Sequence, residues 1–152
     1  MVEERYEVKP IDNYTENIFY ILPKSWKGMN YYTLVFTDLR FFMINQSIFM
    51  TIVGPTEFVR IVEAMELVGG YERMKMARDT FSKWPIYEID RISEFRLMKE
   101  GIKRINIKKG WTDSALALEY LVSGTNDTYE LRFRFPNKFH NETVLRLGDY
   151  VV

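Results

Sequence analysis

Apolar residues recur at every second position along much of this chain, which is the spacing of a β-strand with one buried face. The clearest case is the segment 31–45, YYTLVFTDLRFFMIN, in which two apolar runs flank a short polar link. Its first run alternates, so that Tyr32, Leu34 and Phe36 share one face of a half-buried strand. Its second run, residues 41–44, is apolar on both faces, so both of its sides should be covered. We therefore predict a central β-hairpin that turns in the polar link.

Further strands are expected on both sides of this hairpin, because alternating apolar runs are separated there by turn residues. Pro23 and Gly28 place a loop between the first strand and the hairpin. The clearest second hairpin joins residues 116–122 to residues 129–135, with Glu130, Arg132 and Arg134 facing water. The expected strands outside the central hairpin cover residues 17–22, 48–53, 86–89, 92–99, a stretch around Ile105 and Ile107, 116–122 and 129–135.

A helical period interrupts this pattern near residues 56–83. Thr56 can cap a helix, and Phe58, Ile61, Val62 and Met65 follow at helical spacing. Gly69 and Gly70 should break it before a second amphipathic stretch marked by Tyr71, Met74, Ala77 and Phe81. The methionines could line a groove for a partner, but core packing is the favoured interpretation because Met commonly fills cores. A last helix is expected around Phe139 to Leu147, ending at Gly148.

These elements predict a mainly β fold, either a small antiparallel barrel or two packed sheets, with a helical insertion and a short C-terminal helix. At 152 residues a single domain is the default, and we assign it residues 17–152 behind an acidic lead-in, residues 1–16. Most of the core is expected from Tyr32, Leu34, Phe36, Phe42, Ile44, Leu118, Tyr120, Leu131 and Phe133.

The segment 31–45 resembles the hairpin "L-V-x-T-x-x-R-L" of pleckstrin-homology-like and GRAM-like domains, with Thr37 and Arg40 at the positions of its turn Thr and Arg. The run 84–101, WPIYEIDRISEFRLMKEG, resembles the start of a strand in prokaryotic members that carry a helical insertion, where Ile89 and Ile92 match apolar positions. The resemblance spans roughly residues 17–147 and implies a pleckstrin-homology-like fold.

Two departures from that family bear on the ligand. The closing segment has no Trp, and the lysine followed by basic-x-basic spacing by which phosphoinositide-binding members hold phosphates is absent. Lys24 and Lys27 are present, but the next strand offers Tyr31, Tyr32 and Thr33. The resemblance therefore implies a fold more firmly than a function.

Chemistry-bearing residues give no enzyme signature. The chain has no Cys, which excludes disulfides and thiolate chemistry, and it has a single His, His140. It also lacks the GxxxxGK[ST], GxGxxG, HExxH and GxSxG motifs. We expect a non-catalytic protein without cofactor or metal, with His140 at the surface or at a helix edge, and we rank an unrecognised enzyme as the third hypothesis.

The N-terminal residues contain no apolar core behind a basic segment, so no signal peptide is expected. The longest apolar run, near residues 47–53, is also far shorter than the roughly 20 residues of a membrane-spanning helix. We therefore expect a cytoplasmic protein, at most peripheral at the inner membrane face.

The charge distribution suggests a contact surface. The net charge is zero, yet residues 91–109 hold seven cationic residues against Glu94 and Glu100. This run could attract an anionic bilayer, or its lysines could protect a strand edge from aggregation, which is the preferred interpretation. Trp26 and Trp111, each near lysines, could join the contact or could fold back over the ends of the barrel, which is slightly preferred. The candidate contact residues are Lys24, Trp26, Lys27, Lys99, Lys103, Arg104, Lys108, Lys109 and Trp111.

The partners expected for that surface are an anionic lipid surface or, as the alternative, a protein partner or a second copy of the chain. Nucleic acid is not expected, because the sequence pI is about 6.6 and no broad basic footprint is present.

Overall fold

The computed structural model describes residues 16–46, 64–65, 67–83, 86–122 and 124–151, without the side chains of residues 77, 78 and 80–83. Seven strands form one antiparallel sheet in the order β4-β3-β2-β1-β7-β6-β5, which is not closed into a barrel within these residues. The strands are β1 (Ile18–Lys27), β2 (Asn30–Thr37), β3 (Arg40–Asn45), β4 (Phe95–Met98), β5 (Ile102–Lys109), β6 (Asp113–Leu121) and β7 (Thr128–Pro136). The fold is therefore mainly β, as predicted.

Within the described residues, the helices lie between β3 and β5 and after β7. They are α4 (Gly70–Lys83), α5 (Ile86–Ile92), the 3-10 turns η2 (Lys99–Gly101) and η3 (Asn137–Phe139), and α6 (His140–Leu147). The predicted closing helix and its end at Gly148 are confirmed. Of the predicted insertion, α4 confirms the second stretch, whereas residues 56–63 and the predicted strand 48–53 lie outside the described residues.

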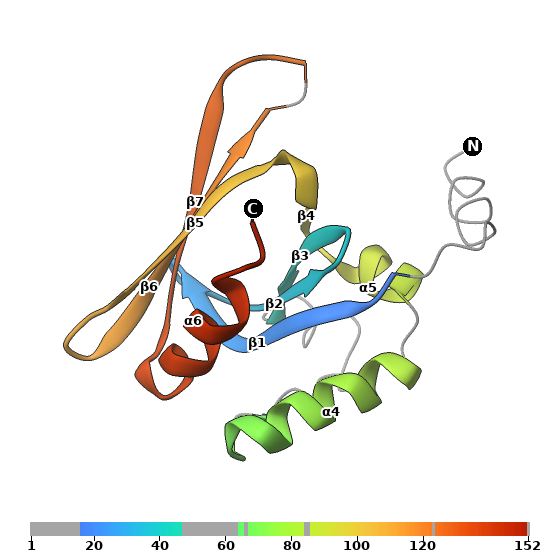
Figure 1. The fold of residues 1–152 in the computed structure, drawn as a ribbon, viewed down its shortest axis with the longest axis vertical. Coiled ribbons are helices and arrows are strands. Elements are labelled where there is room, and N and C mark those ends of the chain that lie inside the picture. The colour runs from blue at the N-terminus through green and yellow to red at the C-terminus, as the bar shows by residue number, and fades with distance from the viewer. Residues whose placement is uncertain (1–15, 47–63, 66, 84–85, 123, 152) are drawn as a thin grey trace.

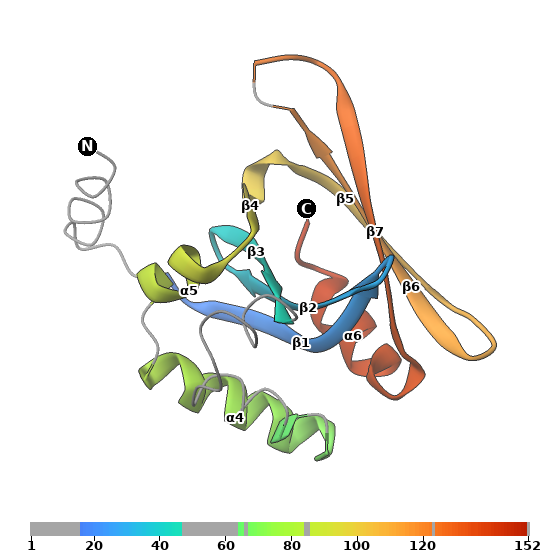
Figure 2. The ribbon, with the colours of Figure 1, turned by 180° about the vertical axis from the view of Figure 1, so that it is seen from behind.

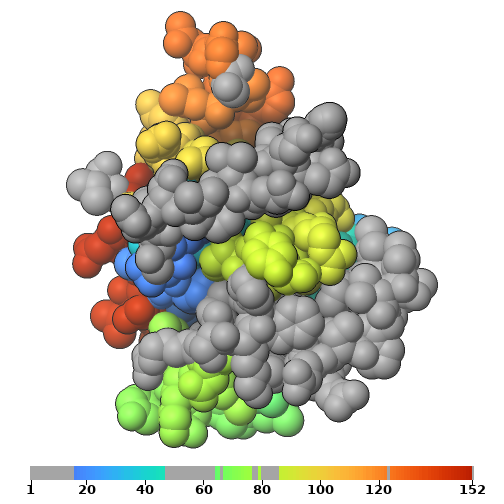
Figure 3. Space-filling view, turned by 90° about the vertical axis from the view of Figure 1, so that its right-hand side faces the viewer, coloured from blue at the N-terminus to red at the C-terminus, as the bar shows by residue number. Residues whose placement is uncertain are grey.

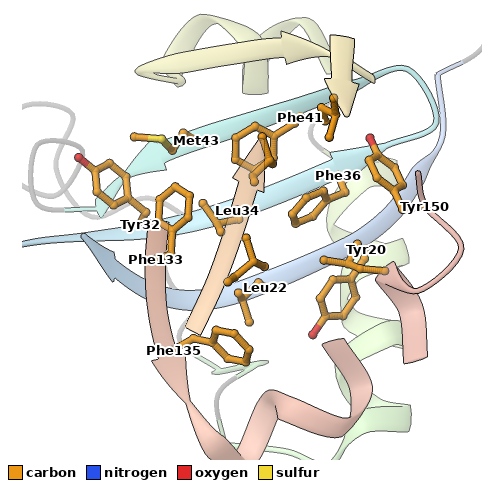
Figure 4. Close-up of a cluster of buried hydrophobic side chains, with 14 of the residues drawn as sticks. Tyr20, Leu22, Tyr32, Leu34, Phe36, Phe41, Met43, Phe133, Phe135 and Tyr150 are labelled. Carbon is orange, nitrogen blue, oxygen red and sulfur yellow. The ribbon is translucent and has the colours of Figure 1, made fainter. Parts of the chain in front are cut away.

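The sheet bends so that β1–β3 face β5–β7 across the main core (Figure 1). This core contains Leu22, Leu34, Phe36, Phe41 and Phe133, all almost fully buried, and Figure 4 shows these side chains converging from both halves of the sheet. The opposite face of β1–β3 carries a second core, which Met65 and the apolar side of α5 cover. Figures 2 and 3 show α5 on that outer side.

Strand β2 is buried on both faces, so its prediction as a half-buried strand was wrong. Thr33, Val35 and Thr37 are fully buried although they lie on the face expected to meet water. The two predicted core residues of β3 face the other way from their assignment: Phe42 and Ile44 belong to the second core, and Phe41 and Met43 to the main one. The prediction that both sides of residues 41–44 are covered is confirmed, because all four side chains are buried. The burial of the second face of β2 by the same layer was not predicted.

The central hairpin turns as predicted, and Thr37 holds the turn. Its hydroxyl accepts hydrogen bonds from the backbone N–H groups of Leu39 and Arg40, at 3.0 and 2.8 Å. The Arg40 guanidinium in turn donates to Glu16, with 2.7 Å between Nη2 and Oε1. The turn is therefore fixed by side chains that are themselves largely buried.

The predicted loop 23–28 is wrong, because β1 continues to Lys27 and only Gly28 and Met29 turn the chain. The pairing of β1 with β2 shifts between Leu22 and Ser25, which accommodates Pro23, a residue without an N–H to donate. The hydroxyl of Thr33 donates to the Pro23 carbonyl at 2.9 Å. Gly28 has φ of 63°, a left-handed conformation that favours glycine.

Residues 86–89 were predicted as a strand, whereas they begin helix α5. Ile86, Ile89 and Ile92 lie three residues apart and pack together against the second core. Three isoleucines among seven residues favour a strand by propensity. The segment is helical because only a helix places all three isoleucines on one face, where they pack against the second core. The 92–99 strand is shorter than predicted, as β4 covers only Phe95–Met98.

A buried polar cluster ties α4, α6 and β1 together. Arg73 of α4 donates from Nε to both carboxylate oxygens of Glu142 on α6, at 2.9 and 3.0 Å. Tyr20 of β1 lies 2.8 Å from the hydroxyl of Thr143 and donates to Glu142 at 3.2 Å. A Cβ at Gly70 would lie 3.2 Å from the same carboxylate, so glycine permits the close approach of α4.

Tyr20 should make the protein sensitive to alkaline pH. Burial first, and then the charge of Glu142, raise the pKa of Tyr20 above its usual 10.0. The folded state therefore keeps this proton at a pH where the unfolded chain has lost it. The resulting stability is present below pH 10 and should fall above it by about 1.4 kcal/mol per pH unit. Urea unfolding at several pH values above 10 gives the free energy of unfolding as a function of pH. This free energy should fall less steeply with pH in Tyr20→Phe than in the control Tyr129→Phe, which changes an exposed tyrosine. An equally steep fall in both variants would contradict the role of Tyr20.

A basic groove on the outer face of the sheet

The face of β5–β7 that points away from the main core carries a row of cationic side chains. Strand pairing sets Lys108 beside Ala115 and Ala115 beside Arg134, and it sets Asn106, Ala117 and Arg132 side by side in the next row. Because the alanines of the middle strand β6 are small, the longer side chains of β5 and β7 form the two walls of a groove whose floor is β6.

The end of β1 completes this surface. Trp26 pairs with Arg134 where β1 joins β7 in the sheet, and Lys27 and Gly28 continue past this pair. Together these residues line a hollow of about 500 Å³. We call this hollow the basic groove and define it by Trp26, Lys27, Asn106, Lys108, Ala115, Ala117, Arg132 and Arg134.

The basic groove has an excess of positive charge. Arg134 donates from Nε to Asp113 at 2.8 Å, and this hydrogen bond raises the pKa of Arg134. Arg132 donates to Glu130 at 2.6 Å. Lys27 and Lys108 form no ion pair within the described part of the chain. Four cations therefore stand against two carboxylates, which leaves two positive charges open to an anionic ligand.

The structure brings together only some of the predicted contact residues. Trp26, Lys27 and Lys108 line the basic groove, and Lys109 and Trp111 lie at the nearby β5–β6 turn. Trp111 is 98% exposed, so the prediction that it folds back onto the protein was wrong; Trp26 is half-buried and lies 6.4 Å from the Tyr31 ring.

The remaining predicted contact residues lie elsewhere. The ammonium of Lys24 sits 5.4 Å from the centre of the Tyr31 ring, and that of Lys99 sits 5.0 Å from the Tyr150 ring. Lys103 and Arg104 border a different hollow, between β5 and α6. Within the described residues β5 ends the sheet, so its lysines also lie on a strand edge, where lysine protects against aggregation.

Sequence reasoning missed Arg132 and Arg134 as site residues. They were correctly expected to face water, but they lie far along the chain from the basic run 91–109. The signal that could have found them is the pairing of three alternating strands, which places every second residue of β5 and β7 on one face.

Among the described residues, His140 has the surroundings that most resemble those of a catalytic residue. Its Nδ1 lies 2.9 Å from the hydroxyl of Ser114, which also donates to Asn137 at 2.6 Å. A hydroxyl with one proton cannot donate to both, so His140 must donate to Ser114 and cannot act as its base. The fully buried Ser114 therefore clamps β6 to the start of α6 and is no nucleophile.

No cluster of three or more His, Asp or Glu side chains suited to a metal occurs among the residues that the structure describes. In the same part of the chain, no helix combines the length and the apolar character needed to cross a membrane. The basic groove is thus the strongest candidate for a functional site.

No protein-family model, curated protein or solved structure matches this chain.

Proposed function

We propose that this protein is a non-catalytic interaction domain of the pleckstrin-homology-like kind that binds anionic membrane surfaces peripherally through the basic groove. The observation that carries the proposal is the convergence of Trp26 and Lys27 with Lys108, Arg132 and Arg134 in one hollow. These residues come from three separate parts of the chain. The inner membrane face is the surface meant, because its anionic lipids give it a negative potential.

Physical chemistry supports a bilayer as the partner. A cation held near an anionic leaflet contributes about 1 kcal/mol. Lys109 at the neighbouring turn, which forms no ion pair with any described residue, adds to the excess charge of the basic groove. Trp111 at that turn is 98% exposed, a costly position for a large aromatic ring in water. At the depth of the lipid headgroups the same ring is stabilised while adjacent ammonium groups stay with phosphate.

The arrangement of elements supports the family part of the proposal. A four-stranded meander β1–β4 is followed by a three-stranded meander β5–β7 and a closing helix α6, and α4 and α5 are inserted after β3. The turn residues Thr37 and Arg40, on which the sequence resemblance rests, stabilise the hairpin turn through their side chains. Neither of them touches the basic groove, so the resemblance bears on the fold and the groove bears on the ligand.

The proposal predicts binding that is electrostatic and shallow. Vesicles rich in phosphatidylserine should shift the tryptophan fluorescence to the blue, and pure phosphatidylcholine vesicles should not. Raising the salt from about 50 to about 300 mM should weaken binding, because the screening length falls. Trp111→Phe should lose most of the blue shift while flotation with the vesicles persists. Absence of flotation at low salt would reject the membrane proposal.

A further inference from the structure

A second hollow lies on the other side of β5, where α6 crosses the strand. It has a volume of about 310 Å³ and is lined by Lys103, Arg104, Ile105, Ile107, Val144, Leu147, Gly148 and Val151. Ile105 and Ile107 are only half-buried, and Val144 is 42% exposed, so apolar surface remains open to water. We call this hollow the β5–α6 groove.

The strand that forms one wall of this groove has a free edge. Within the part of the chain that the structure describes, β5 is the last strand of the sheet and pairs with β6 alone. The N–H of Ile102 donates to the carbonyl of Lys99. Among the described residues, no backbone hydrogen bond joins residues 103–109 to anything beyond β6. Every second residue of β5 therefore presents unpaired N–H and C=O groups directly beside an apolar hollow.

From this juxtaposition we infer that the β5–α6 groove binds an extended peptide of another protein, which adds to β5 as a further strand and alternates apolar with acidic residues. Main-chain hydrogen bonds to the β5 edge would give affinity, as in other cases of strand addition. Alternate side chains of the peptide would point into the hollow against Ile105, Val144 and Leu147. The site is distinct from the basic groove.

The acidic character follows from the charges along the edge. Lys103 and Arg104 line the β5–α6 groove, and no carboxylate does. Arg104 has a partner in Glu119, at 3.4 Å, but Lys103 forms no ion pair within the described part of the chain. The opposite end of the strand adds Lys108 and Lys109. An acidic strand is attracted along the whole edge.

The same charges argue against a second copy of the chain. If two copies paired antiparallel through β5, Lys103 and Arg104 of each copy would lie opposite Lys108 and Lys109 of the other copy. Like charges in facing positions destabilise a strand pair. A partner of opposite charge is favoured for this reason.

A lipid chain fits the groove less well than a peptide. It would bury the free backbone groups of β5 without satisfying them, and each buried donor or acceptor without a partner is costly. A peptide strand satisfies these groups and covers the apolar surface at once.

The test uses three peptides. The parent has eight residues that alternate valine with glutamate. The other two are isomers of each other: one is methylated on the backbone nitrogens of all valines, and the other on those of all glutamates. Successive N–H groups of a strand point to opposite edges, so only one isomer can donate to β5 in the antiparallel orientation, which is the more stable one. We expect the parent peptide and one isomer to bind the full chain and to slow amide exchange in residues 102–109. The other isomer should bind at least about tenfold more weakly. Equal binding of both isomers, or no binding of the parent peptide, would overturn the inference.

Two exposed positions of α6 provide the matched variants. Val144→Arg places a cationic side chain in the groove and should weaken the peptide at least about tenfold by filling the apolar hollow. Leu145→Arg makes the same change at a neighbouring position that is 77% exposed and does not line the groove, and it should bind like the wild type. Equal loss in both variants would overturn the inference. Decanoate binding that Val144→Arg abolishes, with no peptide binding, would assign the groove to a lipid instead.

Discussion

Replacing Glu142 by alanine is expected to lower the free energy of unfolding by about 3 to 5 kcal/mol, because it leaves a buried charge without its partner. The side chain of Arg73 is only 9% exposed and depends on Glu142 for its ion pair. The remaining donor contacts of Arg73 reach the carbonyls of Met65 and Val68, which cannot neutralise a charge. Tyr20 also loses one of its acceptors. Urea unfolding of the single variant measures the effect.

The double variant Arg73→Met with Glu142→Leu shows whether the stability lost in Glu142→Ala comes from an unpaired buried charge or from lost packing. It removes both charges, so it should recover most of the stability lost in Glu142→Ala. Glu119→Ala is the control, since its partner Arg104 is 70% exposed, and the loss there should stay below about 1 kcal/mol. A loss below about 1 kcal/mol for Glu142→Ala would show that this cluster does not hold α4 and α6 together.

The hairpins could be predicted from the sequence because their alternation and their turns agree. In β6 and β7 the apolar residues at 116, 118, 133 and 135 all reach the main core. The turn at residues 37–40 was found from its polar composition, and the hydroxyl of Thr37 explains why it is sharp. Local chemistry decides these elements, so a single sequence is enough to predict them.

The cover on both faces of residues 41–44 was predicted, but the residues that make up the second core were not, because they come together through contacts between distant segments. β3 is apolar on both faces, and only its pairing of Val35 with Phe42 decides which residues face α5. The same contact turns residues 86–92 into a helix although their isoleucines favour a strand. Tertiary packing overrides propensity at both places.

The candidate site was predicted in part for a similar reason. A basic run along the chain suggested one surface, but alternation within β5 sends Lys108 to one face of the sheet and Ile105 and Ile107 to the other. The basic groove takes Arg132 and Arg134 from β7, which only strand register can place beside Lys108. Composition can suggest an anionic ligand, whereas the location of the site requires the fold.

Reversing two charges of the basic groove should nearly abolish membrane binding. Lys108→Glu with Arg132→Glu removes two attractions and adds two repulsions at the surface that faces the lipid. At about 1 kcal/mol for each charge, the loss is about 2 to 4 kcal/mol, or roughly 30-fold to 1,000-fold in affinity. Both side chains are exposed, so the fold should survive the change.

A second double variant, with changes in the basic run 91–109, controls for the change in net charge. Lys99→Glu with Lys103→Glu changes the total charge by the same amount, but these residues lie outside the basic groove. Because exposed charges farther away than about 8 to 10 Å are largely screened at physiological salt, this pair should weaken binding only slightly.

Flotation of the wild type and both double variants with phosphatidylserine-rich vesicles at physiological salt therefore tests the account most directly. We expect the wild type and Lys99→Glu/Lys103→Glu to float with the vesicles, and Lys108→Glu/Arg132→Glu to stay behind. Equal loss in the two variants would show that binding follows net charge, and it would contradict the assignment of the basic groove as the membrane contact.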